Sequence, residues 1–289
     1  MESIKTQVLI LCCLALGAVS CYETPSPLKV DVSGNEAYEK RGEYLVNSLA
    51  WCGFCHSPER KPFGLLSGGV KLLDVYGEVL SPNITPDYKT GIGTFSLDQI
   101  VTAVRDSVSP GNRRFSPEFH AGYEWLSEID ALSIAAYLKS LDGVSRYIPK
   151  REIGFFDRNL KGFFRRSARE IPGYVPEVSE NDRVEYGRYL VDHVARCGLC
   201  HTSEGGIFGG ERYLGGANVT LFAGKSFFAP PINSSRFSSW SDEDILKFFR
   251  TGITPKKTTV DKKLCPIGFI ALASDRDLEA IAQYLKSGS

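Results

Sequence analysis

Apolar side chains recur at helical spacing in two separate stretches of this 289-residue chain, and the helices predicted for the first stretch reappear in the second. Each stretch has an early helix, a middle helix and a last helix. The connecting segments are rich in Gly, Pro and Asn, and no segment shows a convincing strand alternation, so we predict an all-α fold. In the first stretch, the early helix contains residues 41–46, the middle helix begins at Ser96 and the last helix runs over 127–138. In the second stretch, the early helix contains residues 186–191, the middle helix begins at Ser241 and the last helix runs over 274–285.

Serine residues mark the predicted starts of the middle and last helices. In each case a Gln or an Asp follows three positions later, which is the signature of an N-cap with a capping box. The four pairs are Ser96 and Gln99, Ser127 and Asp130, Ser241 and Asp244, and Ser274 and Asp277.

The two stretches form an internal repeat with a constant offset. Gly42 and Gly187 lie 145 positions apart, and the same offset separates Cys52 from Cys197. A glycine inside a helix costs about 1 kcal/mol relative to alanine. We therefore expect each glycine to permit the close approach of another helix.

Each early helix leads into a Cys-x-x-Cys-His motif, first at residues 52–56 and again at residues 197–201. This motif attaches c-type haem, because two cysteines on one helical turn reach the two vinyl groups of a porphyrin. The histidine that follows lies where it can bind the iron from below. A thioredoxin-like redox pair or a zinc knuckle is the alternative for one copy. Two copies, each inside a matching segment, predict two covalent haems, attached through Cys52, Cys55 and His56 and through Cys197, Cys200 and His201.

The N-terminus predicts export. Lys5 precedes an almost wholly apolar run from Val8 to Val19, which is typical of a signal peptide over residues 1–20 and short for a membrane span. Small residues before Cys21 allow cleavage there, and they also resemble a lipobox, so we expect a lipoprotein anchored through Cys21. Plain secretion and an uncleaved anchor are the alternatives. We predict an exported protein in the periplasm or held at a membrane.

Charge excludes one class of partner. Lysine and arginine balance aspartate and glutamate at 34 each, so the totals do not predict binding to nucleic acid. Residues 157–170, between the two stretches, mix aromatic with basic side chains. They predict either a linker that pins the two domains together or a membrane-surface patch, and we favour the linker.

Several runs resemble a known family. Ser81-Pro82-Asn83-Ile84-Thr85-Pro86-Asp87, the following Thr90-Gly91-Ile92-Gly93, and residues 239–244 are similar to the cytochrome c subunits of membrane-bound alcohol, gluconate and aldehyde dehydrogenases. The resemblance implies two tandem class I cytochrome c domains, each wrapped round one covalent haem. We place a tether at 21–35, domain 1 at 36–147, a linker at 148–178 and domain 2 at 179–289. The family commonly has three haems and methionine ligands, whereas this chain has two motifs and only Met1.

The resemblance also implies where the second axial ligands lie. In this class the ligand opposite the proximal histidine comes from the loop before the last helix. His120 follows His56 by 64 positions, and Cys265 follows His201 by the same number. We therefore predict His56 and His120 as iron ligands in domain 1, and His201 and Cys265 in domain 2. For His120, the alternative is an exposed loop histidine, with water or Glu118 as the iron ligand. For Cys265, the alternative is a small buried apolar residue that does not bind iron.

These features predict an electron-transfer protein. It would carry electrons between redox donor and acceptor proteins, with a periplasmic dehydrogenase as the donor suggested by the resemblance. An enzyme similar to thiosulfate dehydrogenases, which have a Cys-ligated haem, is the second hypothesis. A dihaem peroxidase is weaker, because it needs an open iron position. A haem-based redox or gas sensor, in which Cys265 or His120 leaves the iron, is the third.

Overall fold

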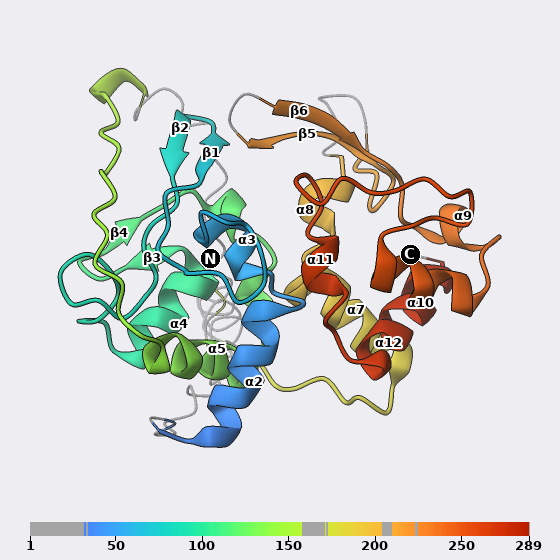
Figure 1. The fold of residues 1–289 in the computed structure, drawn as a ribbon, viewed down its shortest axis with the longest axis horizontal. Helices are drawn as coiled ribbons and strands as arrows, with labels where there is room; N and C mark the ends of the chain where they lie inside the picture. Colours follow the sequence, from blue (N-terminus) through green and yellow to red (C-terminus); the bar gives the residue numbers. More distant parts are fainter. Residues whose placement is uncertain are drawn as a thin grey trace, which may run out of the picture.

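The computed structural model describes Val32, residues 34–157, Ile171 and residues 173–203, 210–222 and 225–288. Its elements gather in two groups that lie side by side in Figure 1, and they are called here the N-terminal half (34–157) and the C-terminal half (173–288). The N-terminal half contains α2 (Glu36–Asn47), α3 (Cys52–His56), β1 (Lys71–Asp74), β2 (Gly77–Leu80), α4 (Leu97–Asp106), β3 (Val108–Ser109), β4 (Arg113–Arg114), η1 (Pro117–Phe119), η2 (Tyr123–Trp125) and α5 (Glu128–Ser140). The C-terminal half contains α7 (Arg183–Tyr189), the π-helical turn η3 (Leu190–Val194), α8 (Gly198–His201), β5 (Ala217–Phe222), β6 (Lys225–Ala229), α9 (Ser234–Phe237), α10 (Asp242–Thr251), α11 (Ile267–Ile270) and α12 (Asp275–Lys286).

The first and last helices of each half cross at a glycine. A Cβ atom added to Gly42 of α2 would lie 1.9 Å from the carbonyl oxygen of Ser133 in α5, and one added to Gly187 of α7 would lie 2.1 Å from that of Ala280 in α12. No side chain fits at either crossing. The prediction that these glycines permit close helix approach is confirmed.

The predicted helix starts are also confirmed. Each serine accepts a hydrogen bond from the backbone N–H three residues later, and the bonds at Ser96 and Ser241 are completed by the reciprocal side chains of Gln99 and Asp244. Such caps satisfy N–H groups that have no partner inside the helix. They fix where α4, α5, α10 and α12 begin.

The prediction of an all-α fold is wrong. The structure contains a four-stranded antiparallel sheet in the order β2-β1-β5-β6, and β3 pairs with β4 in a second sheet. Strands of the larger sheet have four to six residues. In β5, Ala217 and Val219 are buried while Asn218 and Thr220 are exposed, so the alternation is present over too few positions to stand out in a loop-rich segment.

The larger sheet joins the two halves. β1 and β2 form a hairpin in the N-terminal half, β5 and β6 form one in the C-terminal half, and the two hairpins meet where Leu72 pairs with Phe222. Beneath this junction Phe54 makes edge-to-face contacts with Phe222 and Phe269, at 5.5 and 6.1 Å between ring centroids. An apolar cluster therefore ties the first motif helix, α3, to the sheet and to α11 of the other half.

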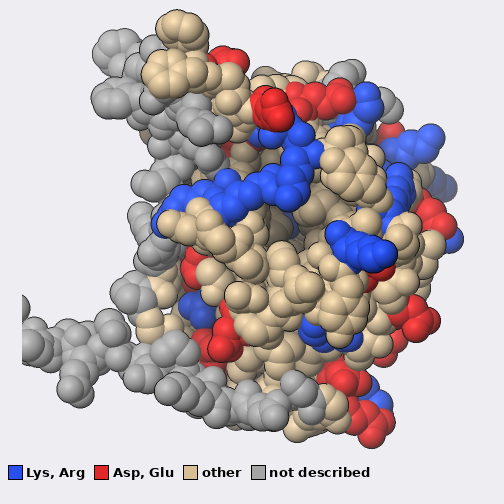
Figure 2. All heavy atoms as spheres, turned by 90° about the vertical axis from the view of Figure 1, so that its left-hand side faces the viewer, with Lys and Arg blue, Asp and Glu red and all other residues tan. Residues whose placement is uncertain are grey.

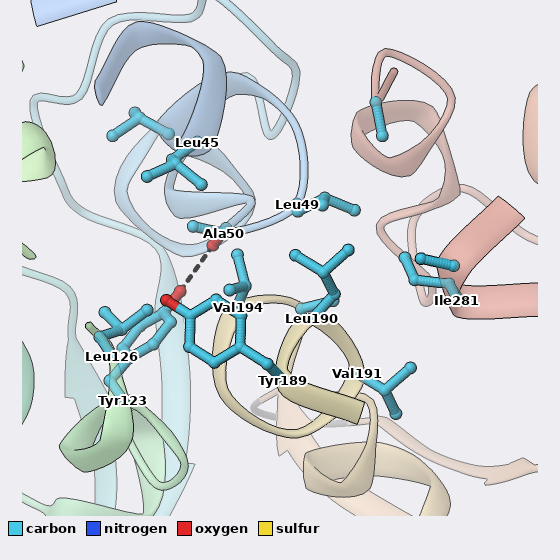
Figure 3. Close-up of a cluster of buried hydrophobic side chains, with 14 of the residues drawn as sticks. Leu45, Leu49, Ala50, Tyr123, Leu126, Tyr189, Leu190, Val191, Val194 and Ile281 are labelled. Carbon is cyan, nitrogen blue, oxygen red and sulfur yellow. Dashed lines mark hydrogen bonds between the residues drawn. The ribbon is translucent and has the colours of Figure 1, made fainter. Parts of the chain in front are cut away.

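The main hydrophobic core is also shared between the halves. In Figure 3, Leu45 of α2 and the following Leu49 and Ala50 face Leu190 and Val194 of η3 across a common interior. The side chains of Tyr123 in η2 and of Leu126 directly after it enter the same space. Because these side chains pack in one cluster, the motif that follows α2 and the motif that follows η3 are held in a fixed relation.

Several predicted segments lie outside the described residues. They are the signal peptide (1–20), Cys21 and nearly all of the tether, and most of the aromatic and basic segment between the halves. Among the described residues no helix has the length and apolar character needed to cross a membrane.

Candidate haem centres

A residue with left-handed backbone geometry directly precedes each Cys-x-x-Cys-His motif. Trp51, before Cys52, has a φ of 38°, and Arg196, before Cys197, has a φ of 49°. Residues other than glycine adopt this region uncommonly. The two turns occupy the same place in the repeat, and each one redirects the chain from the preceding helix into the short motif helix, α3 or α8.

Both motif histidines present a free nitrogen lone pair. The Nδ1 atom of His56 lies 3.0 Å from the carbonyl oxygen of Pro82, and that of His201 lies 2.7 Å from the carbonyl oxygen of Pro230. A carbonyl only accepts, so each Nδ1 carries the hydrogen and each Nε2 keeps its lone pair. Desolvation lowers the pKa of both imidazoles, so both are neutral at pH 7. A hydrogen bond from the second nitrogen is what orients a metal-binding histidine.

A loop anchored by the buried residues Asn83 and Thr85 holds the carbonyl that orients His56. Asn83, directly after Pro82, donates to the carbonyl oxygen of Val144 at 2.8 Å and accepts a hydrogen bond from the Thr85 hydroxyl at 2.7 Å. A Cβ atom on Gly91 would lie 2.0 Å from the carbonyl oxygen of Thr85, so glycine is needed there. The Ser-Pro-Asn-Ile-Thr run thus has a structural task that the sequence alone did not reveal.

The motif cysteines are free, partly buried thiols. Desolvation raises the pKa of Cys52 to about 12, that of Cys55 to about 11 and that of Cys200 to about 12. A thioredoxin-like pair needs a cysteine whose pKa is lowered. These thiols therefore do not fit that alternative. Among the described residues there is also no group of three or more His, Cys, Asp or Glu side chains that could hold a metal ion, as a zinc knuckle would require.

His120 lies opposite His56. Their ring centroids are 6.4 Å apart, with an angle of 57° between the ring planes. Two imidazoles on opposite sides of one metal ion have centroids about 6 Å apart, since each metal–nitrogen bond is about 2 Å long. The Nδ1 atom of His120 faces the carbonyl oxygen of Ala103 at 3.2 Å, which leaves Nε2 unprotonated in the neutral ring. The two residues fit a pair of axial iron ligands.

The surroundings of His120 keep its ring neutral. Desolvation, followed by the positive charge of Arg196, lowers its pKa to about 3. The rings of Phe115 and Tyr123 contact the imidazole edge-on, at 5.2 and 5.6 Å between centroids. Neutral, packed imidazole is the form that binds a metal.

Cys265 lies beside the second motif. It directly precedes Pro266, the N-cap of α11, and it is a free, partly buried thiol. Desolvation raises its pKa to about 11. It is close enough to Cys197 and Cys200 to contribute to the raised pKa of both. The structure thus brings Cys265 near the second site, and its role as an iron ligand stays a prediction.

Sequence reasoning overlooked three side chains between the motifs. Trp51, Tyr123 and Arg196 are each at most 5 % exposed and contact one another across the two halves. The only sequence feature that could have indicated them is that Trp51 and Arg196 occupy equivalent positions in the repeat. His193, the remaining histidine, donates a hydrogen bond through Nδ1 to the carbonyl oxygen of Gly122 at 3.0 Å.

Comparison with curated proteins identifies similar cytochrome subunits, while no family model matches the chain. The chain is 32 % identical over 258 residues to the fructose dehydrogenase cytochrome subunit of Gluconobacter japonicus, covering 86 % of this chain and 52 % of that protein. It is 28 % identical over 277 residues to the gluconate 2-dehydrogenase cytochrome c subunit of Pantoea cypripedii, covering 89 % and 61 %. A diheme cytochrome c-type protein of Cereibacter sphaeroides is 28 % identical over 288 residues, with 94 % of each chain covered.

These relatives confirm the resemblance predicted from the sequence motifs. Their names also support the predicted class, an electron-carrying dihaem c-type cytochrome with two covalently attached haems. The chain spans roughly half the length of the fructose dehydrogenase subunit and 61 % of the gluconate dehydrogenase subunit. It spans nearly all of the diheme cytochrome.

Proposed function

We propose that this chain is a dihaem c-type cytochrome that carries electrons from a donor dehydrogenase to a respiratory acceptor. One observation supports this most strongly. Two equivalent motif helices each end in a neutral histidine whose Nδ1 donates to a carbonyl, and both helices are anchored in one shared core. Two redox centres held rigidly in one chain suit electron relay better than binding of a small substrate.

The proposal assigns a role to each site residue. In the first site Cys52 and Cys55 would form the thioether bonds, and His56 and His120 would bind the iron. In the second site Cys197 and Cys200 would form the thioether bonds, and His201 and Cys265 would bind the iron. Each bound haem supplies one-electron exchange between ferric and ferrous iron. The chain holds the porphyrins in apolar surroundings, and the carbonyls of Pro82 and Pro230 orient the proximal imidazoles.

The proposed organisation follows the repeat. Residues 36–147 and 179–289 are the two haem-binding domains, and residues 148–178 link them. Residues 1–20 direct export, and residues 21–35 tether the protein to a membrane through a lipid on Cys21. A membrane-bound sugar or alcohol dehydrogenase is the proposed donor, because similar chains are the cytochrome subunits of fructose, gluconate and alcohol dehydrogenases.

Haem attachment is tested by expression in a bacterium that exports proteins and attaches haem to them. The purified chain should carry two covalent haems by mass and by absorbance of the denatured protein. The double variant Cys52→Ala/Cys55→Ala should lose one haem, and Cys197→Ala/Cys200→Ala should lose the other. Cys265→Ala is the matched control and should keep both. A colourless wild-type protein would overturn the proposal.

The electron-transfer role is tested by measuring which electron donor reduces the haems of the purified protein. A membrane-bound sugar or alcohol dehydrogenase with its substrate should reduce both haems. Reduction by thiosulfate alone would instead support the enzyme hypothesis, which the position of Cys265 beside the second motif favours. Carbon monoxide binding to the ferrous protein would support the sensor, because it requires an axial ligand that leaves the iron. The lipid is tested separately by membrane fractionation of Cys21→Ala.

A further inference from the structure

The residues that precede the two motifs contact each other across the halves. The indole Nε1 of Trp51 donates a hydrogen bond to the carbonyl oxygen of Ala195 at 2.7 Å. The guanidinium carbon of Arg196 lies 4.7 Å from the Trp51 ring centroid and 3.7 Å from that of Tyr123. Trp51 is bonded to Cys52 and Arg196 is bonded to Cys197, so one contact links the starts of both motif helices.

Arg196 is a buried cation without a carboxylate partner among the described residues. It is 5 % exposed, one guanidinium nitrogen donates to the carbonyl oxygen of Phe119 at 2.6 Å, and its Nε has no hydrogen-bond partner in the described part of the chain. Removing a charge from water is costly, and stacking on two aromatic faces offsets only part of that cost. Because this charge is buried and has no carboxylate partner among the described residues, its electric field acts on neighbouring groups with little screening.

The guanidinium lies close to the ligands of the first site. The Tyr123 ring contacts both Arg196 and His120. Its phenol donates to the carbonyl oxygen of Ala50 at 2.7 Å, two residues before Cys52 (Figure 3). Electrostatics agree with this placement, because the positive charge acts to lower the pKa of Cys52, Cys55, His56 and His120. The same charge acts on Cys200 of the second motif as a smaller contribution.

Surface charges of this protein have a different effect. On the face shown in Figure 2, acidic and basic side chains are interspersed and lie in solvent. Water and salt screen such charges over about 8–10 Å. The charge of Arg196 is surrounded by Trp51, Tyr123 and apolar core, where screening is weak.

We propose that Arg196 sets the reduction potentials of the two haems, raising that of the first haem more than that of the second. This inference depends on the proposed haem sites. When a ferric haem accepts one electron from the donor dehydrogenase, its iron loses one unit of positive charge. A fixed cation nearby favours the reduced state by repulsion of the oxidised one. A side chain from the second motif thereby makes the first haem the better electron acceptor.

The test is a spectroelectrochemical titration of the purified holoprotein, with Arg196→Gln and Arg196→Lys compared with wild type. Loss of the charge in Arg196→Gln should shift the reduction equilibrium of the first haem by about tenfold towards the oxidised form, which is about 59 mV for one electron. The second haem should shift less, in the same direction. Arg196→Lys keeps the charge and should stay near wild type. Equal shifts in both variants would mean that packing and not charge is responsible, and unchanged potentials in Arg196→Gln would overturn the inference.

Two further variants separate charge from structure. Arg196→Leu removes the charge and leaves an apolar side chain in the pocket, so it should shift both potentials as Arg196→Gln does even if the latter folds poorly. Arg188→Gln removes an exposed arginine that is paired with Glu185 and should leave both potentials unchanged. Covalent haem content is measured on every sample. Absence of haem in wild type would defeat the proposed function, whereas two haems with no potential shift would defeat only the role of Arg196.

Discussion

Tyr189 of the C-terminal half donates a hydrogen bond to Asp130 of the N-terminal half, with 2.7 Å between the phenol oxygen and Oδ2. The equivalent residue of the other half makes the reciprocal bond, from Tyr44 to Asp277. Both aspartates are buried and stand at the third position of the last helix of their half, α5 or α12. The first helix of each half is therefore fastened to the last helix of the other.

Removal of one phenol should loosen this fastening. Tyr189→Phe leaves Asp130 with the guanidinium of Arg41, 2.8 Å away, but without its phenol partner. A buried acceptor that loses a partner costs about 1–3 kcal/mol. Urea unfolding of the holoprotein should show a loss in this range. Tyr147→Phe removes the hydroxyl of an exposed tyrosine and should leave stability within about 0.5 kcal/mol of wild type. Equal midpoints for the two variants would contradict the importance of the bond.

Glycine at the helix crossings should not tolerate even one methyl group. In Gly42→Ala the new Cβ would lie 1.9 Å from the Ser133 carbonyl oxygen, so α2 and α5 must separate. We expect a loss of roughly 1–3 kcal/mol, as found for overpacked cores, or failure to accumulate folded protein. Gly154→Ala has no atom within 4 Å of its Cβ and serves as the control. Thermal unfolding monitored by circular dichroism measures both, and a wild-type melting temperature for Gly42→Ala would be inconsistent with the crossing.

Cys265→Met should act on one haem only. An anionic sulfur ligand stabilises ferric iron, whereas a thioether does so less, so the potential of the second haem should rise. The potential of the first haem should stay nearly unchanged, because the ligand predicted for that site is His120. Spectroelectrochemistry of the wild type should also place both potentials below those of methionine-ligated relatives, with the second haem lower. Two wild-type potentials in the usual His/Met range would contradict the predicted ligands, which electron paramagnetic resonance of the oxidised protein tests directly.

Asn83→Ala should weaken the support of His56. The amide of Asn83 is buried and connects the Pro82 loop to the carbonyl oxygen of Val144. Its removal leaves buried backbone groups without partners, at a cost of about 1–3 kcal/mol. We expect the first haem to lose its native absorbance at a lower urea concentration than the second. Asn181→Ala, at an exposed turn, is the control, and simultaneous loss of both haems in Asn83→Ala would show that the effect is global.

Sequence patterns correctly predicted the parts of this structure that depend on residues close together in the chain. The serine caps and the glycine crossings follow from the capping box and from helix packing, so Ser96 and Gly42 could be interpreted without coordinates. The pairing of Leu72 with Phe222 could not, because it joins strands from different halves. The same holds for Trp51 and Arg196, since their contact depends on how the two repeats face each other. The placement of His120 opposite His56 agrees with the spacing of the repeat, although its role as an iron ligand stays a prediction.

The exchanged bonds of Tyr44 and Tyr189 have the form of an isologous interface, in which residue i of one copy contacts residue j of the other and the converse also holds. In a symmetric homodimer the positions before the two motifs would carry the same side chain. Tryptophan would then face tryptophan, or two arginines would meet in a dry interior at a high electrostatic cost. Fusion of the two copies in one polypeptide removes that constraint. A unit duplicated within one chain can place an indole on one side of the axis and a guanidinium on the other, and so add a difference in charge to the difference in predicted iron ligands between the two centres.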